Sequence, residues 1–248
     1  MITAYFNSTY IIVGAESKVV DVKTHKASHD ECKVTRLGQD SFFAGTGLQY
    51  VTMPESQQHK FDGVELAKRA FNMHSSLSEI VQSWISNMEE KYTELLSDEP
   101  DVPWWKEDKP MGSGIFGGMD GDELSLYVAH ISYTVNNRGF HHTIEKKVPR
   151  DMWLNFGTID ATEPYIKEFL EGKTERSRRV HADINEYVKD LHINKLSYNV
   201  IIARNIIEAT IAWSAGSIPE IGGNISVLIL EKGKPNRWFR QSDLCGTQ

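Results

Sequence analysis

The sequence predicts an α+β fold in which two antiparallel β-sheets pack face to face, with helices on their outer sides. Strand-type segments joined by short polar turns occur in pairs near the start of the chain and again in its middle, and helix-type spacing of apolar residues fills the stretches between them. A glycine pair, Gly222 and Gly223, then opens a last apolar strand after a helix-type run. This order is typical of a mixed fold and not of a regularly alternating parallel one.

The first half of the chain predicts two hairpins and a helical region. Residues 1–22 predict two strands that turn at residues 7–9, and residues 33–52 predict a second pair that turns at residues 38–40, because β-branched and aromatic residues flank polar turn formers. Apolar residues at helical spacing then predict one long helix over 62–96, or two helices with a break near Ser75. Asp62 is the expected N-cap.

Residues 97–114 are rich in proline and glycine and predict an irregular connection. We expect its adjacent Trp104 and Trp105 either to fold back on the core or to contact a partner or substrate.

The second half predicts strands at 115–119, 124–135 and 141–148, helices at 163–171, 178–191 and 198–215, and a final strand at 224–230. His141 and His142 are neighbours on one of these strands. Adjacent strand residues point to opposite faces, so we do not expect them to share a metal ion.

Composition limits the function classes. The chain has 248 residues and a net charge of −7, and phosphate binding requires concentrated basic residues, so we expect no nucleic-acid partner. No apolar run predicts a signal peptide or a membrane helix, and we expect no membrane association. Cys32 and Cys245 are far apart and lack metal-site spacing, so we predict unpaired cysteines, no zinc site and a cytoplasmic protein.

Four segments, in this order, resemble the proteasome subunits of the N-terminal nucleophile (Ntn) hydrolase superfamily. They are Ile11–Ser17, Cys32–Gly47, Ile115–Val128 and Gly222–Leu230, which together extend over most of the chain, from about residue 10 to about residue 232. The resemblance is to a divergent, bacterial-style member. It implies one domain over residues 1–248, with the four-layer αββα arrangement in which helices flank two central sheets.

The resemblance also implies a catalytic set. In the family, an N-terminal threonine attacks an amide, its α-amine serves as the base, a lysine tunes the nucleophile and an acid orients that lysine. Carried onto this chain, the set is Thr3 after processing, Lys33 and Glu16, which replaces the usual aspartate, with Thr158 as an assisting hydroxyl. Counting back from Glu16 along an ungapped match puts the family's threonine about one residue before Met1. No metal or cofactor is implied.

Further positions bear on the site. Gly45 and Gly47 match strand glycines that admit a substrate strand in the family, although strand glycines are also typical of bulges. Ser217–Ile221 departs from the family pattern, because Ile221 stands where a serine is usual. Lys33 and Glu16 are equally consistent with a structural ion pair.

Three functions follow from these observations. The first is a threonine-type peptidase or amidohydrolase that acts on peptide or amide bonds once Thr3 is exposed. The second is a catalytically silent subunit that assembles into a homo-oligomer. The third is a protein that binds a small molecule.

Overall fold

The computed structural model of the chain describes residues 1–20, 27–52, 59–98, 110–134, 139–156, 166–175, 177–179, 182, 195–214 and 222–245. It has an α+β fold with two five-stranded antiparallel sheets and a few helices. The chain divides into two compact units. The first unit comprises residues 1–34, 150–231 and 236–248, and the second comprises residues 35–149 and 232–235. A single domain remains a prediction.

The sheet of the first unit confirms the predicted N-terminal hairpin. Its strand order is β12 (Met152–Phe156), β1 (Ile2–Phe6), β2 (Tyr10–Glu16), β13 (Ile225–Glu231) and β14 (Arg237–Arg240). The turn between β1 and β2 forms because the Asn7 side chain accepts hydrogen bonds from the amides of Thr9 and Tyr10, both at 2.9 Å. The two central strands, β1 and β2, are completely buried.

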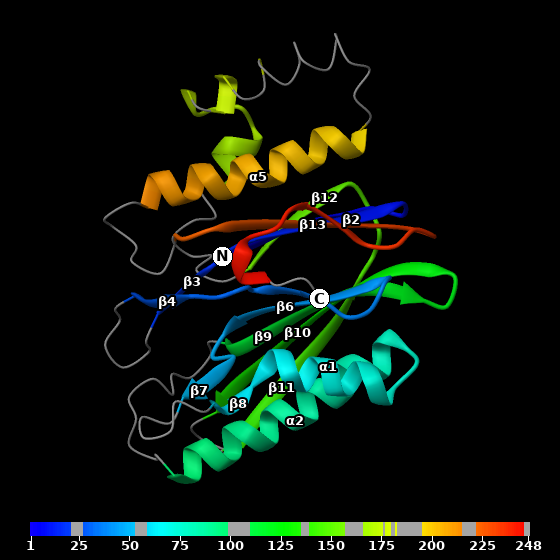
Figure 1. Cartoon of the computed structure of the whole chain (residues 1–248), viewed down its shortest axis with the longest axis vertical. Helices are drawn as coiled ribbons and strands as arrows, with labels where there is room; N and C mark the ends of the chain where they lie inside the picture. The colour runs from blue at the N-terminus through cyan, green and yellow to red at the C-terminus, as the bar shows by residue number, and fades with distance from the viewer. Residues whose placement is uncertain are drawn as a thin grey trace. The chain divides into compact units, whose positions relative to one another are not determined.

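Helix α5 (Lys195–Ser214) confirms the helix predicted at 198–215 and packs on β1, β2 and β13 (Figure 1). Its apolar residues and those of the sheet form one hydrophobic cluster that includes Met1, Ile206 and Val227. The absence of a side chain at Gly14 makes room for this contact, because a Cβ there would lie 2.6 Å from Cδ1 of Ile207 and that side chain would have to shift. Helix α5 therefore covers the face of the sheet on which the Met1 side chain lies.

Smaller elements complete the first unit. They are the two-stranded pair β3 (Lys18–Val20) and β4 (Ala27–Asp30) and the 3-10 turn η1 (Asp243–Cys245). Of the helices predicted at 163–171 and 178–191, residues 166–170, 178–179 and 182 are helical, and the remainder lies outside the described residues apart from the turn at 171.

The sheet of the second unit confirms the predicted central hairpins. Its strand order is β11 (Gly139–Lys147), β10 (Glu123–Thr134), β9 (Pro110–Asp120), β6 (Ser41–Gly47) and β5 (Val34–Arg36), with a separate pair β7 (Tyr50–Thr52) and β8 (His59–Asp62). Gly38 and Gly121 supply the positive φ angles of the β5–β6 and β9–β10 turns, at 83° and 64°.

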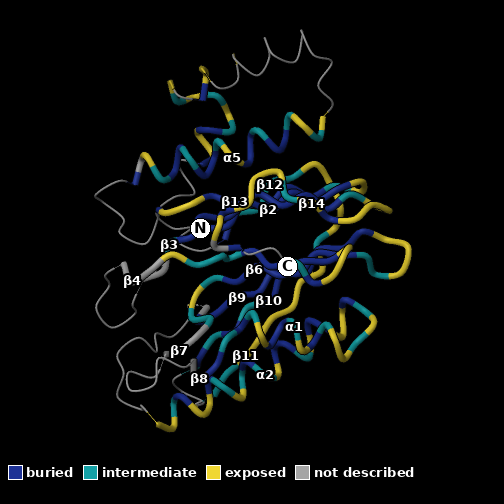
Figure 2. The backbone as a smooth tube through the Cα atoms, viewed as in Figure 1, coloured by how far each residue is buried: buried dark blue, intermediate teal, exposed yellow. Residues whose placement is uncertain are grey.

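The helical region of the second unit consists of two helices, α1 (Gly63–Met73) and α2 (Leu77–Asp98). Asp62 caps α1 as predicted, accepting a 2.8 Å hydrogen bond from the amide of Val64. Ser76 caps the start of α2, because its hydroxyl accepts a 3.3 Å hydrogen bond from the amide of Glu79 and donates one of 2.9 Å to the Glu79 carboxylate, which explains the break near Ser75. Figure 2 shows buried residues along the two helices and along the strands they cover. Trp84 of α2 is fully buried in their hydrophobic cluster.

Among the described residues, no helix is both long and apolar enough to cross a membrane. Trp104 and Trp105 lie outside the described residues.

Candidate functional site

The candidate site is built around Glu16, the last residue of β2, whose side chain is fully buried. Its Oε1 atom contacts both the α-amine of Met1 and the Nζ of Lys33. Its Oε2 atom accepts hydrogen bonds from the backbone amides of Lys18, at 2.7 Å, and Gly222, at 3.4 Å. Four donors from four separate places in the sequence therefore converge on one buried carboxylate.

The β1–β2 pairing delivers the chain terminus to this carboxylate. Ile2 pairs with Ala15, and one residue further along, the amide of Glu16 donates a 3.3 Å hydrogen bond to the carbonyl of Met1. Met1 and Glu16 are thus opposite each other across the hairpin. The register of the sheet fixes which α-amine meets Glu16.

Lys33 comes from residues 31–33, which connect β4 to β5 and belong to neither strand. The amide of Glu31 ties this connection to the carbonyl of Ser17, at 2.7 Å, directly after β2. Lys33 then reaches Glu16 with its side chain 18% exposed, so the ion pair has one edge near solvent.

The electrostatics of the site follow from two amino groups that share one carboxylate. Burial opposes ionisation of Glu16, but the α-amine of Met1 and the Lys33 ammonium outweigh it, and the pKa of Glu16 falls below its ordinary value. Burial, and then the charge of Lys33, lower the pKa of the Met1 α-amine from 8.0 to about 5. At neutral pH the α-amine is therefore uncharged beside an intact Lys33–Glu16 ion pair.

An uncharged α-amine beside an ammonium could accept a proton from a nucleophile. Met1, however, ends in a thioether, which has no proton to lose. Its side chain also packs into the hydrophobic cluster under α5. In a chain that retains Met1, the activating groups are therefore assembled around a residue that cannot act as a threonine-type nucleophile.

Thr3 lies elsewhere on β1. Its side chain is buried, and its Oγ1 donates a 2.9 Å hydrogen bond to the Oδ1 of Asn155 on the neighbouring strand β12. It pairs with Gly14, two residues along the hairpin from the Met1–Glu16 level, a displacement of roughly 6.6 Å. The structure thus brings Glu16 and Lys33 together and places Thr3 apart from them.

Other groups of the chain closely approach the backbone of the glycine pair before β13. The amide of Gly222 donates to Glu16, and Gly223 has a φ angle of 80°. A Cβ at Gly223 would lie 2.4 Å from Oγ of Ser17 and 2.5 Å from Oδ1 of Asp30. A side chain at Gly223 would be strained and would collide with both neighbours. Thr158 and Ser217–Ile221 lie outside the described residues.

Gly45 and Gly47 belong to the second unit, on β6. A Cβ at Gly45 would lie 2.6 Å from Oε1 of Gln49, and Gly47, with a φ angle of 81°, is packed against the carbonyl of Met111. The space beside both glycines is thus occupied by groups of the chain itself, Gln49 at Gly45 and the carbonyl of Met111 at Gly47. Substrate binding there remains a prediction.

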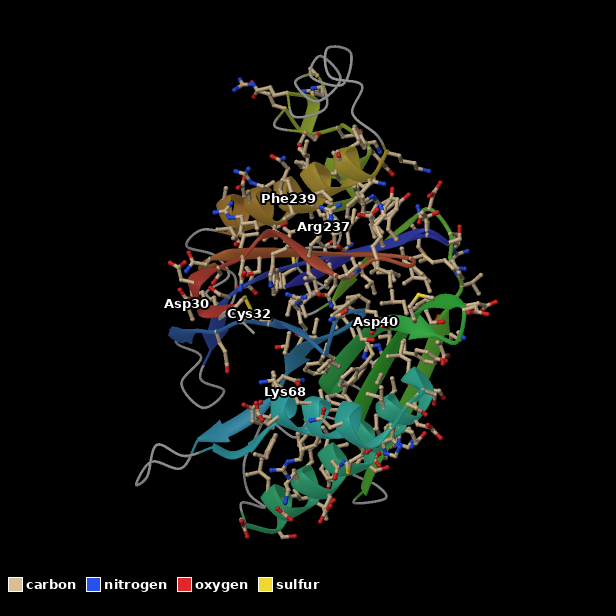
Figure 3. All side chains as sticks on the ribbon, turned by 45° about the vertical axis from the view of Figure 1, so that its right-hand side comes forward. Asp30, Cys32, Asp40, Lys68, Arg237 and Phe239 are labelled. Atoms are coloured by element: carbon tan, nitrogen blue, oxygen red, sulfur yellow. A yellow bond between two sulfur atoms is a disulfide. The ribbon has the colours of Figure 1, made fainter. Side chains whose placement is uncertain are left out.

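The prediction of unpaired cysteines is wrong. Cys32 and Cys245 form a disulfide, with their Cα atoms 4.9 Å apart. The sequence could not indicate this pairing, because 213 residues separate the two cysteines and only the fold brings η1 to the connection that carries Lys33. Figure 3 labels Cys32 together with Asp30, the last residue of β4.

His141 and His142 have different partners, as expected for strand neighbours. The Nδ1 of His141 lies 2.8 Å from Oγ1 of Thr134, and the Nδ1 of His142 lies 2.8 Å from Oε1 of Glu89 on α2. Within the described ranges, no group of three or more potential metal-ligating side chains occurs.

The part of the site that sequence reasoning missed is Met1. The sequence did indicate this position, because counting back from Glu16 along the ungapped match places the family's threonine near residue 1 and not at Thr3. The chain matches no protein-family model and no curated protein sequence. Its resemblance to the Ntn hydrolases therefore stays a prediction from the order of its sequence motifs.

Proposed function

We propose that the chain is a proteasome-like protein of the Ntn hydrolase superfamily, with a four-layer αββα arrangement, and that the form retaining Met1 is catalytically silent. The single observation that carries this proposal is the placement of the N-terminal α-amine on the Glu16–Lys33 pair. An amine, a lysine and a carboxylate held together at a chain terminus are the groups that this superfamily uses to activate a terminal nucleophile.

We expect the form that retains Met1 to be inactive because its N-terminal residue has no nucleophilic side chain. Met1 supplies the amine but no hydroxyl or thiol. Its side chain is also part of the core, so rearranging it to admit a substrate would cost packing energy. The proposed role is that of a non-catalytic subunit in a homo-oligomer, the use that the resemblance suggests for a silent member.

A threonine-type peptidase or amidohydrolase is the second candidate. It is favoured by the position of Thr3 on the same face of β1 as Met1, since side chains two residues apart in a strand share a face. An N-terminal Thr3 would bring its amine near Glu16 only if β1 shifted by two residues relative to β2. A shift of two residues leaves every side chain of β1 on the same face of the sheet. The shift would also bring Tyr5 opposite Gly14, where Ile207 of α5 already lies close.

The test compares two chains. The intact mass of the purified protein establishes whether Met1 is retained, and a chain released by proteolysis to begin at Thr3 is prepared beside it. Both are assayed against a panel of fluorogenic peptide amides and for covalent labelling by an electrophilic peptide, with Thr3→Ala in each chain as the matched control.

We expect the chain with Met1 to be inactive and to sediment as an oligomer. Thr3-dependent turnover by the shortened chain would establish the second candidate. Turnover by the Met1-retaining chain that survives Thr3→Ala would overturn both proposals.

A further inference from the structure

The Cys32–Cys245 disulfide is attached to the site through an adjacent residue. Cys32 directly precedes Lys33, and Cys245 ends η1 close to the end of the chain. Residues 31–33 lie in neither flanking strand. The disulfide is therefore a covalent tether on a short connection whose next residue makes the ion pair with Glu16.

The other end of the tether is anchored on the strand that faces Glu16. The hydroxyl of Ser226 lies 3.0 Å from the sulfur of Cys245 and accepts a 3.2 Å hydrogen bond from the amide of Ser242. Ser226 follows Ile225 on β13, and Ile225 pairs with Glu16. The disulfide thus links the Lys33 connection to the strand beside its partner carboxylate.

We propose that the Cys32–Cys245 disulfide is a redox-sensitive positioning device that holds Lys33 on Glu16. In the oxidised protein the tether limits the movement of residues 31–33 and keeps the ion pair formed. In the reduced protein the connection loses its covalent tie to β13, and Lys33 exchanges between Glu16 and solvent.

The chemistry requires a dithiol as co-reactant. A thiolate of the dithiol attacks one sulfur, the second thiolate resolves the mixed disulfide, and the dithiol leaves as its own disulfide while Cys32 and Cys245 become thiols. Cys32 is half-buried, so a small dithiol can reach it. Disulfides that form in a reducing cytoplasm are usually transient and redox-sensing, so this role is compatible with the cytoplasmic location that we predict.

The inference goes beyond the proposed function, and its test does not depend on hydrolysis. The protein is oxidised in air or reduced with dithiothreitol and is then treated briefly with an acetylating N-hydroxysuccinimide ester at neutral pH. Mass spectrometry of peptides measures acetylation of Lys33 and of Lys146, an internal reference that is 46% exposed in the second unit.

We expect reduction to raise acetylation of Lys33 several-fold and to leave that of Lys146 unchanged. Cys245→Ser should give the same result without reductant. Ser226→Ala is the matched control, because it loosens η1 but keeps the disulfide, and it should resemble the oxidised wild type.

Two results would overturn the inference. One is equal acetylation of Lys33 in the oxidised and reduced proteins. The other is complete alkylation of Cys32 in air-oxidised, denatured protein, which would mean that the pair does not form. Far-UV circular dichroism identifies global unfolding of Cys245→Ser, and reduced wild type then supplies the comparison.

Discussion

The α-amine of Met1, the first residue of the chain, contacts the carboxylate of Glu16, the last residue of β2. Both groups are buried, and the hairpin register fixes their approach. A terminus held in this way is part of the folded structure. Changes at Met1 or Glu16 should therefore alter stability as well as any chemistry at the site.

Glu16→Gln should destabilise the protein strongly. The substitution removes the negative charge that Met1 and Lys33 both contact, and breaking a buried ion pair from one side typically costs about 3–5 kcal/mol. Urea unfolding would measure the change. Glu65→Gln is the matched control, because Glu65 is 57% exposed and its pair with Lys68 should contribute at most about 1 kcal/mol. Equal losses in the two variants would contradict a buried, structurally important Glu16.

Stability should rise with pH between pH 7 and pH 8. The pKa of the Met1 α-amine is lowered from 8.0 to about 5 on folding, so between these values the unfolded chain binds more protons than the native one. Because stability then increases with pH, the free energy of unfolding should grow by about 1 kcal/mol from pH 7 to pH 8. Urea unfolding at both pH values measures this slope.

The control for the pH slope is Lys33→Met. Removing the second cation leaves one amine with one carboxylate, so the pKa of the α-amine should rise and the slope should flatten. Burial also lowers the pKa of His130. This shift likewise makes stability rise with pH, but mainly at pH values below 6.5, the ordinary pKa of histidine. A slope that persists unchanged in Lys33→Met would mean that burial alone keeps the pKa of the α-amine well below 7, whereas the absence of a slope in the wild type would contradict the lowered pKa.

Local sequence patterns predicted much of this fold because they depend on neighbouring residues. The Asn7 turn, the Asp62 cap and the positive-φ turns at Gly38 and Gly121 all follow from chemistry within a few positions. The pairing of Cys32 with Cys245 could not be predicted in this way, since it depends on how β13 and η1 return to the first hairpin.

The candidate site was predictable in part from the resemblance, which placed Glu16 and Lys33 in one catalytic set although 17 residues separate them. The residue whose α-amine contacts Glu16 could not be predicted, because it depends on the exact register of β1 against β2. A difference of two residues in that register decides between Met1 and Thr3.

Thr3 and Asn155 should be energetically coupled. Thr3 donates its hydroxyl hydrogen to Oδ1 of Asn155 at 2.9 Å, and loss of such a hydrogen bond costs about 1 kcal/mol. We expect Thr3→Val and Asn155→Ala each to destabilise the protein and the double variant to lose less than the sum, by about 1 kcal/mol. A double-mutant cycle in urea measures this coupling. Strict additivity would show that the hydrogen bond between Thr3 and Asn155 contributes nothing to stability.

Gly45→Ala distinguishes a packing role from substrate binding at β6. A Cβ at Gly45 would lie 2.6 Å from Oε1 of Gln49, whose Nε2 donates hydrogen bonds to the carbonyls of Thr46, at 2.7 Å, and Ser113, at 3.2 Å. Alanine must therefore displace Gln49 from these bonds, and overpacking of this kind costs about 1–3 kcal/mol.

Gln49→Ala removes the obstacle together with its hydrogen bonds, so the double variant Gly45→Ala/Gln49→Ala should be more stable than the sum of the single losses predicts. Urea unfolding of the four proteins measures the cycle. If Gly45→Ala leaves stability unchanged and abolishes only the binding of a peptide amide, the glycine serves a substrate. If it destabilises the protein and Gln49→Ala relieves the loss, the glycine is there because Gln49 occupies the space beside it.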